Sequence, residues 1–168
     1  PKSVIHSFRK VMGIFGIEGY VSNYEQYKAC NAPYTTHEEV IVGEKKLRKK
    51  MVPIKEHTYT WVNLPDNAIL IFDEVHRCKS MTSMNSALLV AAKRQGLRVL
   101  AMSATAAVNP LDMRAIGYLL GLFPINDYHN WLVDHSCRLY SRGWQFRGDN
   151  STIQEIHEKI YPNKGSRI

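Results

Sequence analysis

Acidic and hydroxyl side chains follow two separate apolar runs of the sequence, and their types suit chemistry on a phosphate ester. Asp73 and Glu74 follow the first run, with His76 two residues later, and Ser103 and Thr105 follow the second. A first carboxylate can hold Mg²⁺, while a second can orient and polarise an attacking water molecule. Two adjacent anions repel each other unless a cation shares the site. An Asp-Glu pair by itself is more typical of a surface turn, so its position in the fold decides its meaning.

The two apolar runs have the pattern of strands buried on both faces of a parallel sheet. Residues 68–72 and 98–102 are short and lack alternation. Between them, apolar residues recur at helical spacing from 81 to 91, and Gly96 is expected to end this helix. Ligands bind beyond the carboxyl ends of parallel strands, so we expect the acids and the hydroxyls at one sheet edge. The alternation of strands and helices predicts an α/β fold.

Further elements are predicted from periodicity and capping residues. They are a helix over 4–15 that stops at Gly16, a short strand over 18–21, and a turn or helix start at 22–25. A later helix starts at Asn109 and Pro110 and stops at Gly121, and a last helix starts at a capping box of Thr152 and Glu155. Residues 122–149 are irregular and aromatic-rich, with most aromatic side chains assigned to packing. Residues 31–60 lack periodicity, and their basic run at 44–50 is either a solvated helix face or a phosphate-contacting patch.

Bulk properties restrict the class of protein. The 168 residues suffice for one domain, and the net charge of +7 favours polyanionic partners without identifying one. Three scattered cysteines fit a reducing compartment, and the scattered histidines do not predict structural zinc. No apolar run approaches the ~20 residues that span a bilayer, and the first residues do not resemble a secretory signal. We therefore expect an intracellular protein, cytoplasmic or nuclear, without a membrane partner.

Several motifs carry a family resemblance. The tetrapeptide Asp73-Glu74-Val75-His76 resembles motif II (Walker B, DExH type) of superfamily-two helicases, and Ser103-Ala104-Thr105 resembles their motif III. Three further segments resemble motifs of the Swi/Snf-like, chromatin-remodeller-like branch. Residues 76–80 resemble its H-R-x-K-N motif, residues 21–25 resemble its (T/S)-(S/N)-Y-E motif, and residues 1–8 resemble its motif Ia. Residues 106–123 and 156–167 look like segments of viral and phage members. Residues 31–60 match nothing in the family.

The resemblance implies that residues 1–168 are an incomplete first motor lobe, a RecA-like parallel sheet sandwiched by helices, with an irregular charged insertion at about 31–60. The family's phosphate loop, ending in Gly-Lys-Thr, does not occur in this sequence, and the arginine fingers belong to the second lobe. An arginine finger alone contributes ~10³-fold or more to phosphoryl transfer. We therefore expect an ATPase in the full-length parent and very little activity in the fragment alone.

The resemblance also implies roles for individual residues, with ATP and Mg²⁺ as cofactors. Asp73 would be the Mg²⁺-linked acid and Glu74 the water-activating residue. The coupling group between the nucleotide and nucleic-acid sites would be His76, Ser103 and Thr105. Such translocases hold phosphates rather than bases, and the residues implied to contact the backbone of a bound strand are Lys2, Ser3, Ser22 and Asn23.

The sequence thus predicts the first lobe of an ATP-dependent DNA translocase or helicase. Its expected partners are DNA, with RNA less favoured, and the second RecA-like lobe of the same parent chain. A virus- or phage-encoded origin fits the resemblance of the C-terminal third. Three alternatives stay open: a degenerate, non-catalytic nucleic-acid-binding or interaction module, the motor subunit of a restriction system, and an RNA helicase. A Gly-Lys-Thr or Gly-Lys-Ser loop upstream would favour a motor over the degenerate module, whereas the intact acids already count against degeneracy.

Overall fold

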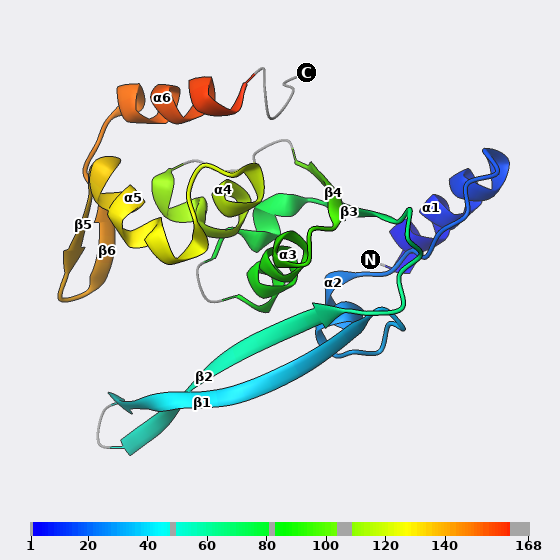
Figure 1. Ribbon diagram of the computed structural model, residues 1–168, viewed down its shortest axis with the longest axis horizontal. Coiled ribbons are helices and arrows are strands. Elements are labelled where there is room, and N and C mark those ends of the chain that lie inside the picture. Colours follow the sequence, from blue (N-terminus) through cyan, green and yellow to red (C-terminus); the bar gives the residue numbers. More distant parts are fainter. Residues whose placement is uncertain (1, 48–49, 81–82, 104–108, 162–168) are drawn as a thin grey trace.

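The computed structural model describes residues 2–47, 50–80, 83–103 and 109–161. Its helices are α1 (Lys2–Ile14), α2 (Tyr24–Lys28), α3 (Met84–Arg94), α4 (Arg114–Leu120), α5 (Tyr128–Asp134) and α6 (Asn150–Ile160). Its strands are β1 (Thr35–Leu47), β2 (Lys50–Trp61), β3 (Ile69–Asp73), β4 (Arg98–Met102), β5 (Cys137–Tyr140) and β6 (Gly143–Phe146). Short 3₁₀ helices are η1 (Val75–Cys78), η2 (Pro110–Asp112) and η3 (Ile125–Asp127). Helices α3 and α4 lie centrally, between α1 at one end and the β5–β6 hairpin with α6 at the other (Figure 1).

Strands β3 and β4 form the parallel pair on which the predicted site depends. Ile69 lies opposite Arg98 and Asp73 opposite Met102, in unbroken parallel register. The predicted parallel pairing is confirmed, with the first strand one residue later than expected. Because Ser103 directly follows Met102, Asp73 and Ser103 leave the sheet at the same edge. The described residues thus have a mixed α/β fold with three two-stranded sheets, of which this one is parallel and two are antiparallel.

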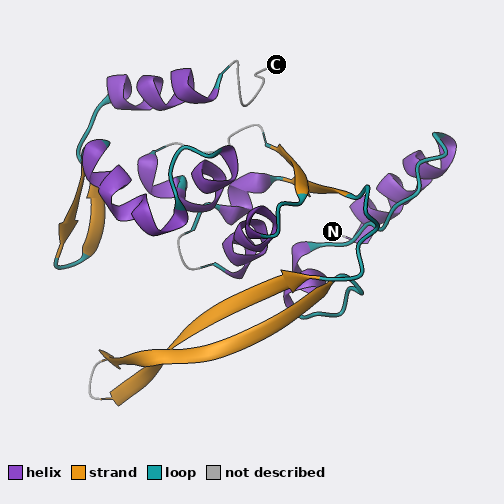
Figure 2. Cartoon of the chain, viewed as in Figure 1, coloured by secondary structure: helices purple, strands orange, loops and turns teal. Residues whose placement is uncertain are grey.

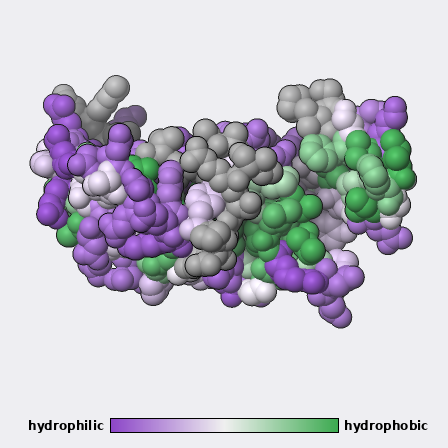
Figure 3. Space-filling view, turned by 90° about the horizontal axis from the view of Figure 1, so that it is seen from above, coloured by the Kyte–Doolittle hydropathy of each residue, from purple (hydrophilic) through white to green (hydrophobic). Residues whose placement is uncertain are grey.

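The β3–β4 pair is covered on one face only by the described residues. Phe72 is buried and belongs to the core that α3 supplies, whereas the alternate side chains Ile69, Ile71 and Leu100 are exposed. Successive side chains of a strand point to opposite faces, so this alternation follows directly from one-sided packing. Burial on both faces, predicted from the apolar runs, is therefore wrong for the described structure. Figure 3 shows the apolar surface gathered over this region and over α1.

Residues 31–60 are regular rather than irregular, and this prediction is also wrong. They contain a long antiparallel ribbon of β1 and β2 that extends away from the helices (Figure 2). The alternation that marks β2 is confined to its end, where Tyr59 and Trp61 are buried and Thr58 and Thr60 are exposed. The basic run at 44–50 lies at the far end of this ribbon, partly outside the described residues, so it is not a helix face.

The helix boundaries largely follow the predicted capping residues. Gly16 and Gly96 follow α1 and α3 with positive φ, and Gly121 ends α4 with φ 69°. The side chain of Asn109 accepts a hydrogen bond from the Leu111 N–H as predicted, but Pro110 opens the 3₁₀ turn η2 before α4 begins. None of the described helices is long and apolar enough to cross a membrane.

Three local predictions are wrong. Residues 18–21 form no strand, whereas the helix start predicted at 22–25 is confirmed, because Asn23 caps α2. Residues 122–149 contain α5 and the β5–β6 hairpin. The last helix is capped by Asp149, which accepts from the Ser151 N–H, rather than by Thr152.

The core joins the ribbon to the central helices. Leu88, Leu89 and Ala92 of α3 are almost fully buried, and the indole N–H of Trp61 donates to the Leu88 carbonyl at 3.0 Å. The amide side chain of Gln95 pairs with both backbone groups of Trp61, accepting from its N–H and donating to its C=O, each at 2.8 Å. This pair of hydrogen bonds anchors the end of β2 to the end of α3.

Gln95→Ala is expected to lower the free energy of unfolding by about 1–3 kcal/mol, since it leaves two backbone groups of the buried Trp61 without these partners. Gln154→Ala, which removes one exposed hydrogen bond to Glu158 within α6, is the matched control and should cost at most about 0.5 kcal/mol. Urea unfolding followed by tryptophan fluorescence measures both. Equal losses for the two variants would contradict the anchoring role of Gln95.

Candidate functional site

The 3₁₀ turn η1 presents the predicted acids at the carboxyl end of β3. Val75 and Cys78 are 2% and 0% exposed, and their spacing of three residues places them on one side of a 3₁₀ turn. They fix the turn to the core, which leaves Asp73 and Glu74 exposed. Burial also raises the pKa of the Cys78 thiol to about 11, so this side chain is a neutral packing group.

Glu74 has an unusual backbone conformation. Its φ of 53° and ψ of 49° lie in the left-handed region, which costs a residue with a Cβ roughly 1–2 kcal/mol. The Glu74 N–H donates to Oδ1 of Asp73 at 3.0 Å, so the first acid stabilises the turn that carries the second. Strain of this kind at a non-glycine residue is concentrated at functional sites in proteins.

The ring of His76 connects the second acid to the end of the neighbouring strand. Its Nδ1 lies 3.0 Å from Oε2 of Glu74 and 3.1 Å from the Ser103 hydroxyl oxygen. A carboxylate only accepts, so Nδ1 must carry a proton to bond Glu74, and toward this protonated nitrogen the hydroxyl oxygen of Ser103 acts as an acceptor. The structure thus brings together three of the predicted residues. Thr105, the other predicted coupling residue, lies outside the described residues.

The residues implied to contact a nucleic-acid backbone lie at the starts of two helices. Lys2 and Ser3 belong to the first turn of α1, and their side chains are outside what the structure describes. Ser22 and Asn23 precede α2, where both serve local structure: the Ser22 hydroxyl donates to the side chain of Gln26, and Oδ1 of Asn23 accepts from the Gln26 N–H at 2.9 Å. Their roles toward a ligand remain predictions.

Sequence reasoning did not place two further residues, Tyr24 and Arg77, at the acid turn, which consists of Asp73, Glu74 and η1. The Tyr24 hydroxyl donates to the Asp73 carbonyl at 2.9 Å, and the Arg77 guanidinium lies 5.3 Å from the centre of the Tyr24 ring. Both residues belong to segments with a family resemblance, 21–25 and 76–80. That resemblance was the available signal, but it did not indicate that the two segments touch.

The donor set at the acid turn fits Mg²⁺ held together with a phosphate group. Among the described residues there is no group of three or more His, Cys, Asp or Glu side chains arranged to hold a metal by themselves. Protein-bound Mg²⁺ commonly uses one or two carboxylates and takes its remaining ligands from water and substrate phosphates. The exposed carboxylate of Asp73 is suited to such a role.

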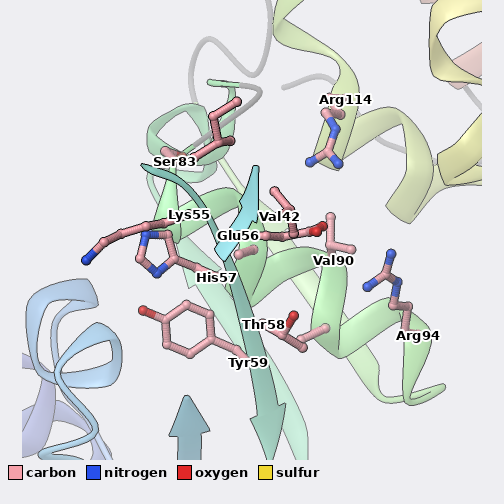
Figure 4. A pocket seen from close by; sticks show the side chains of 13 residues that line it. Val42, Lys55, Glu56, His57, Thr58, Tyr59, Ser83, Val90, Arg94 and Arg114 are labelled. Carbon is pink, nitrogen blue, oxygen red and sulfur yellow. The ribbon is translucent and has the colours of Figure 1, made fainter. Parts of the chain in front are cut away.

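A separate hollow of about 260 Å³ lies between β2 and helices α3 and α4, away from the acid turn. Figure 4 shows Glu56 extending from β2 toward the side where Arg94 and Arg114 lie. Burial lowers the pKa of Arg114, and the nearby charge of Arg94 acts in the same direction. The hollow contains none of the residues predicted for catalysis, coupling or nucleic-acid contact.

Comparison with known proteins yields one informative similarity. No family model matches the chain, and no solved structure matches it. A curated protein of Acanthamoeba polyphaga mimivirus, named "Putative ATP-dependent RNA helicase L364", is 28% identical over 173 aligned residues that cover 95% of this chain. The chain spans about 30% of the length of that relative. The chain is thus similar to one part of a longer protein that is named as a helicase.

Proposed function

We propose that this chain forms part of the first, RecA-like motor lobe of an ATP-dependent helicase or translocase. The observation that carries the proposal is the meeting of Glu74, His76 and Ser103 at one edge of a parallel strand pair. Nucleotides bind beyond the carboxyl ends of strands in such sheets. The similarity to a mimiviral protein named as a helicase supports the same class independently.

Each residue has a defined task in this proposal. Mg²⁺, when bound with ATP, would neutralise charge on the phosphate oxygens, and Asp73 would hold it. Glu74 orients the attacking water, because its exposed carboxylate lies one residue beyond Asp73 and is held by His76. Ser103 senses the state of that carboxylate through the shared Nδ1 of His76. A change at the nucleotide can thus reach the second strand without passing through the backbone.

The finer assignment is a Swi/Snf-like translocase acting on duplex DNA, and it rests on the resemblance of residues 21–25 and 76–80 to that branch. An RNA substrate is the second candidate, because the mimiviral relative is named an RNA helicase. Both share the acid turn and its coupling to Ser103. Only the polymer that stimulates hydrolysis distinguishes them.

Steady-state ATP hydrolysis by the full-length protein, alone and with duplex DNA or RNA, tests the proposal. We expect one polymer to stimulate hydrolysis. In Ser103→Ala the polymer-stimulated rate should fall about 5- to 10-fold and the basal rate should fall less, because the lost hydrogen bond to His76 couples the nucleotide site to the nucleic-acid site. Ser151→Ala, in the first turn of α6, is the control. Absence of hydrolysis with either polymer would overturn the proposal in favour of a non-catalytic module.

A further inference from the structure

Tyr24 lies between the segment that carries Ser22 and Asn23 and the turn that carries the acids. Its hydroxyl donates to the Asp73 carbonyl at 2.9 Å, and its ring packs against that of Phe72 with centroids 6.1 Å apart. Phe72 is 5% exposed and belongs to the core. Tyr24 therefore joins α2 to the end of β3 through one polar and one apolar contact.

Arg77 of η1 adds further contacts to this junction. Its guanidinium lies over the Tyr24 ring at 5.3 Å, and its Nη2 is 3.6 Å from Oε1 of Glu25. Oε2 of Glu25 pairs with Lys28 at 2.8 Å, and the pKa of Glu25 is lowered mainly by that bond, with Arg77 acting in the same direction. Two consecutive residues of α2 thus contact a single residue of η1.

The peptide unit between Asp73 and Glu74 is held at both of its polar atoms. Tyr24 donates to its C=O, and Oδ1 of Asp73 accepts from its N–H. The following residue, Glu74, has the strained φ of 53°. Burial raises the pKa of the Tyr24 phenol well above its usual range, with Cys78 as a further contributor, so the phenol stays a donor at neutral pH.

We propose that Tyr24 is a positioning residue that holds the Asp73–Glu74 peptide in its strained orientation and, with Glu25 and Arg77, transmits movement of α2 to the acid pair. The inference rests on the proposed function, because it assigns a regulator to the same site. Nucleic acid bound beside α2 shifts Tyr24, and the orientation of the Glu74 carboxylate changes with it. The polymer thereby controls the alignment of the hydrolytic water.

Tyr24→Phe in the full-length protein removes the phenol hydroxyl and keeps the ring that Arg77 covers. We expect kcat for ATP hydrolysis to fall about 10-fold, the usual cost of losing a group that orients a reactive side chain. The ratio of polymer-stimulated to basal rate should fall toward one, while KM for ATP changes little. Tyr27→Phe is the matched control, because Tyr27 lies in the same helix and packs on Trp61. The Tyr27→Phe variant should hydrolyse ATP at the wild-type basal and stimulated rates.

Glu25→Gln and Arg77→Gln provide a second measurement that does not depend on how Tyr24→Phe folds, since both residues are exposed. Each should lower the stimulation ratio and keep the thermal midpoint, whereas a merely structural role would lower the midpoint and leave the ratio unchanged. Wild-type kcat and stimulation in all three variants would overturn the inference and leave the proposed function standing. An inactive wild-type protein would instead overturn the proposed function itself.

Discussion

Glu74→Gln in the full-length protein is expected to lower the rate of ATP hydrolysis at least about 100-fold while ATP binding stays nearly intact, because the carboxylate that orients the water is lost and the side-chain shape is kept. Glutamine also keeps an oxygen within reach of His76 Nδ1, 3.0 Å from the carboxylate in the wild type. Steady-state hydrolysis and binding of a fluorescent ATP analogue measure the two effects separately.

The strained backbone at residue 74 requires a stability control. Gln and Glu both carry a Cβ, so the left-handed conformation costs the same in each and the thermal midpoint should not change. Glu158→Gln, on the exposed surface of α6, should hydrolyse ATP at the wild-type rate. Hydrolysis by Glu74→Gln at the wild-type rate would show that the acid turn is not catalytic and would favour a degenerate, non-catalytic module.

Asp73→Asn is expected to produce the opposite pattern, with Mg²⁺-dependent nucleotide binding weakened at least about 10-fold, or about 1.4 kcal/mol. In the wild type, the Glu74 N–H donates to Oδ1 of Asp73 at 3.0 Å. Asparagine keeps a side-chain oxygen that can accept this bond, so the turn should persist. The variant lacks the negative charge with which Asp73 would attract a divalent cation at contact distance, where Coulomb energies are large. Nucleotide titrations at several Mg²⁺ concentrations measure the change.

Binding without Mg²⁺ separates the metal from the nucleotide in this experiment. Asp73→Asn and the wild type should bind ATP equally in the presence of EDTA, because only the metal-linked part of the affinity is removed. Asp66→Asn, in the exposed loop before β3, is the control at the opposite end of the same strand. Equal Mg²⁺ dependence in Asp73→Asn and the wild type would exclude Asp73 as the metal-linked acid.

Local patterns in the sequence were sufficient for the strands and helices around the acid turn. The apolar runs before Asp73 and Ser103 predicted parallel strands that end at one edge, and β3 and β4 pair in that way. The glycines after α1, α3 and α4 marked helix ends, because a positive φ is cheap for glycine and depends on few distant contacts. These features are decided within a few residues of the chain.

Other features depended on contacts between distant segments, and the sequence did not reveal them. The β1–β2 ribbon pairs residues that are individually polar and charged over most of its length, so no apolar period marks it. Which face of the β3–β4 pair is buried depends on where α3 packs, since strand side chains alternate whether or not a partner covers them. Both were therefore predicted wrongly.

The candidate site likewise contains residues that the sequence predicted and a contact that only the tertiary structure shows. Asp73, Glu74, His76 and Ser103 were recognisable by type and spacing, because a strand end fixes where its next residues emerge. The link from Tyr24 to the Asp73 carbonyl spans 49 positions of the chain and ends on a backbone atom that every residue possesses. The residue types therefore do not predict such a bond. Only the packing of α2 against β3 and η1 decided it, because every residue offers a backbone carbonyl and the position of the Tyr24 hydroxyl selects which one is bonded.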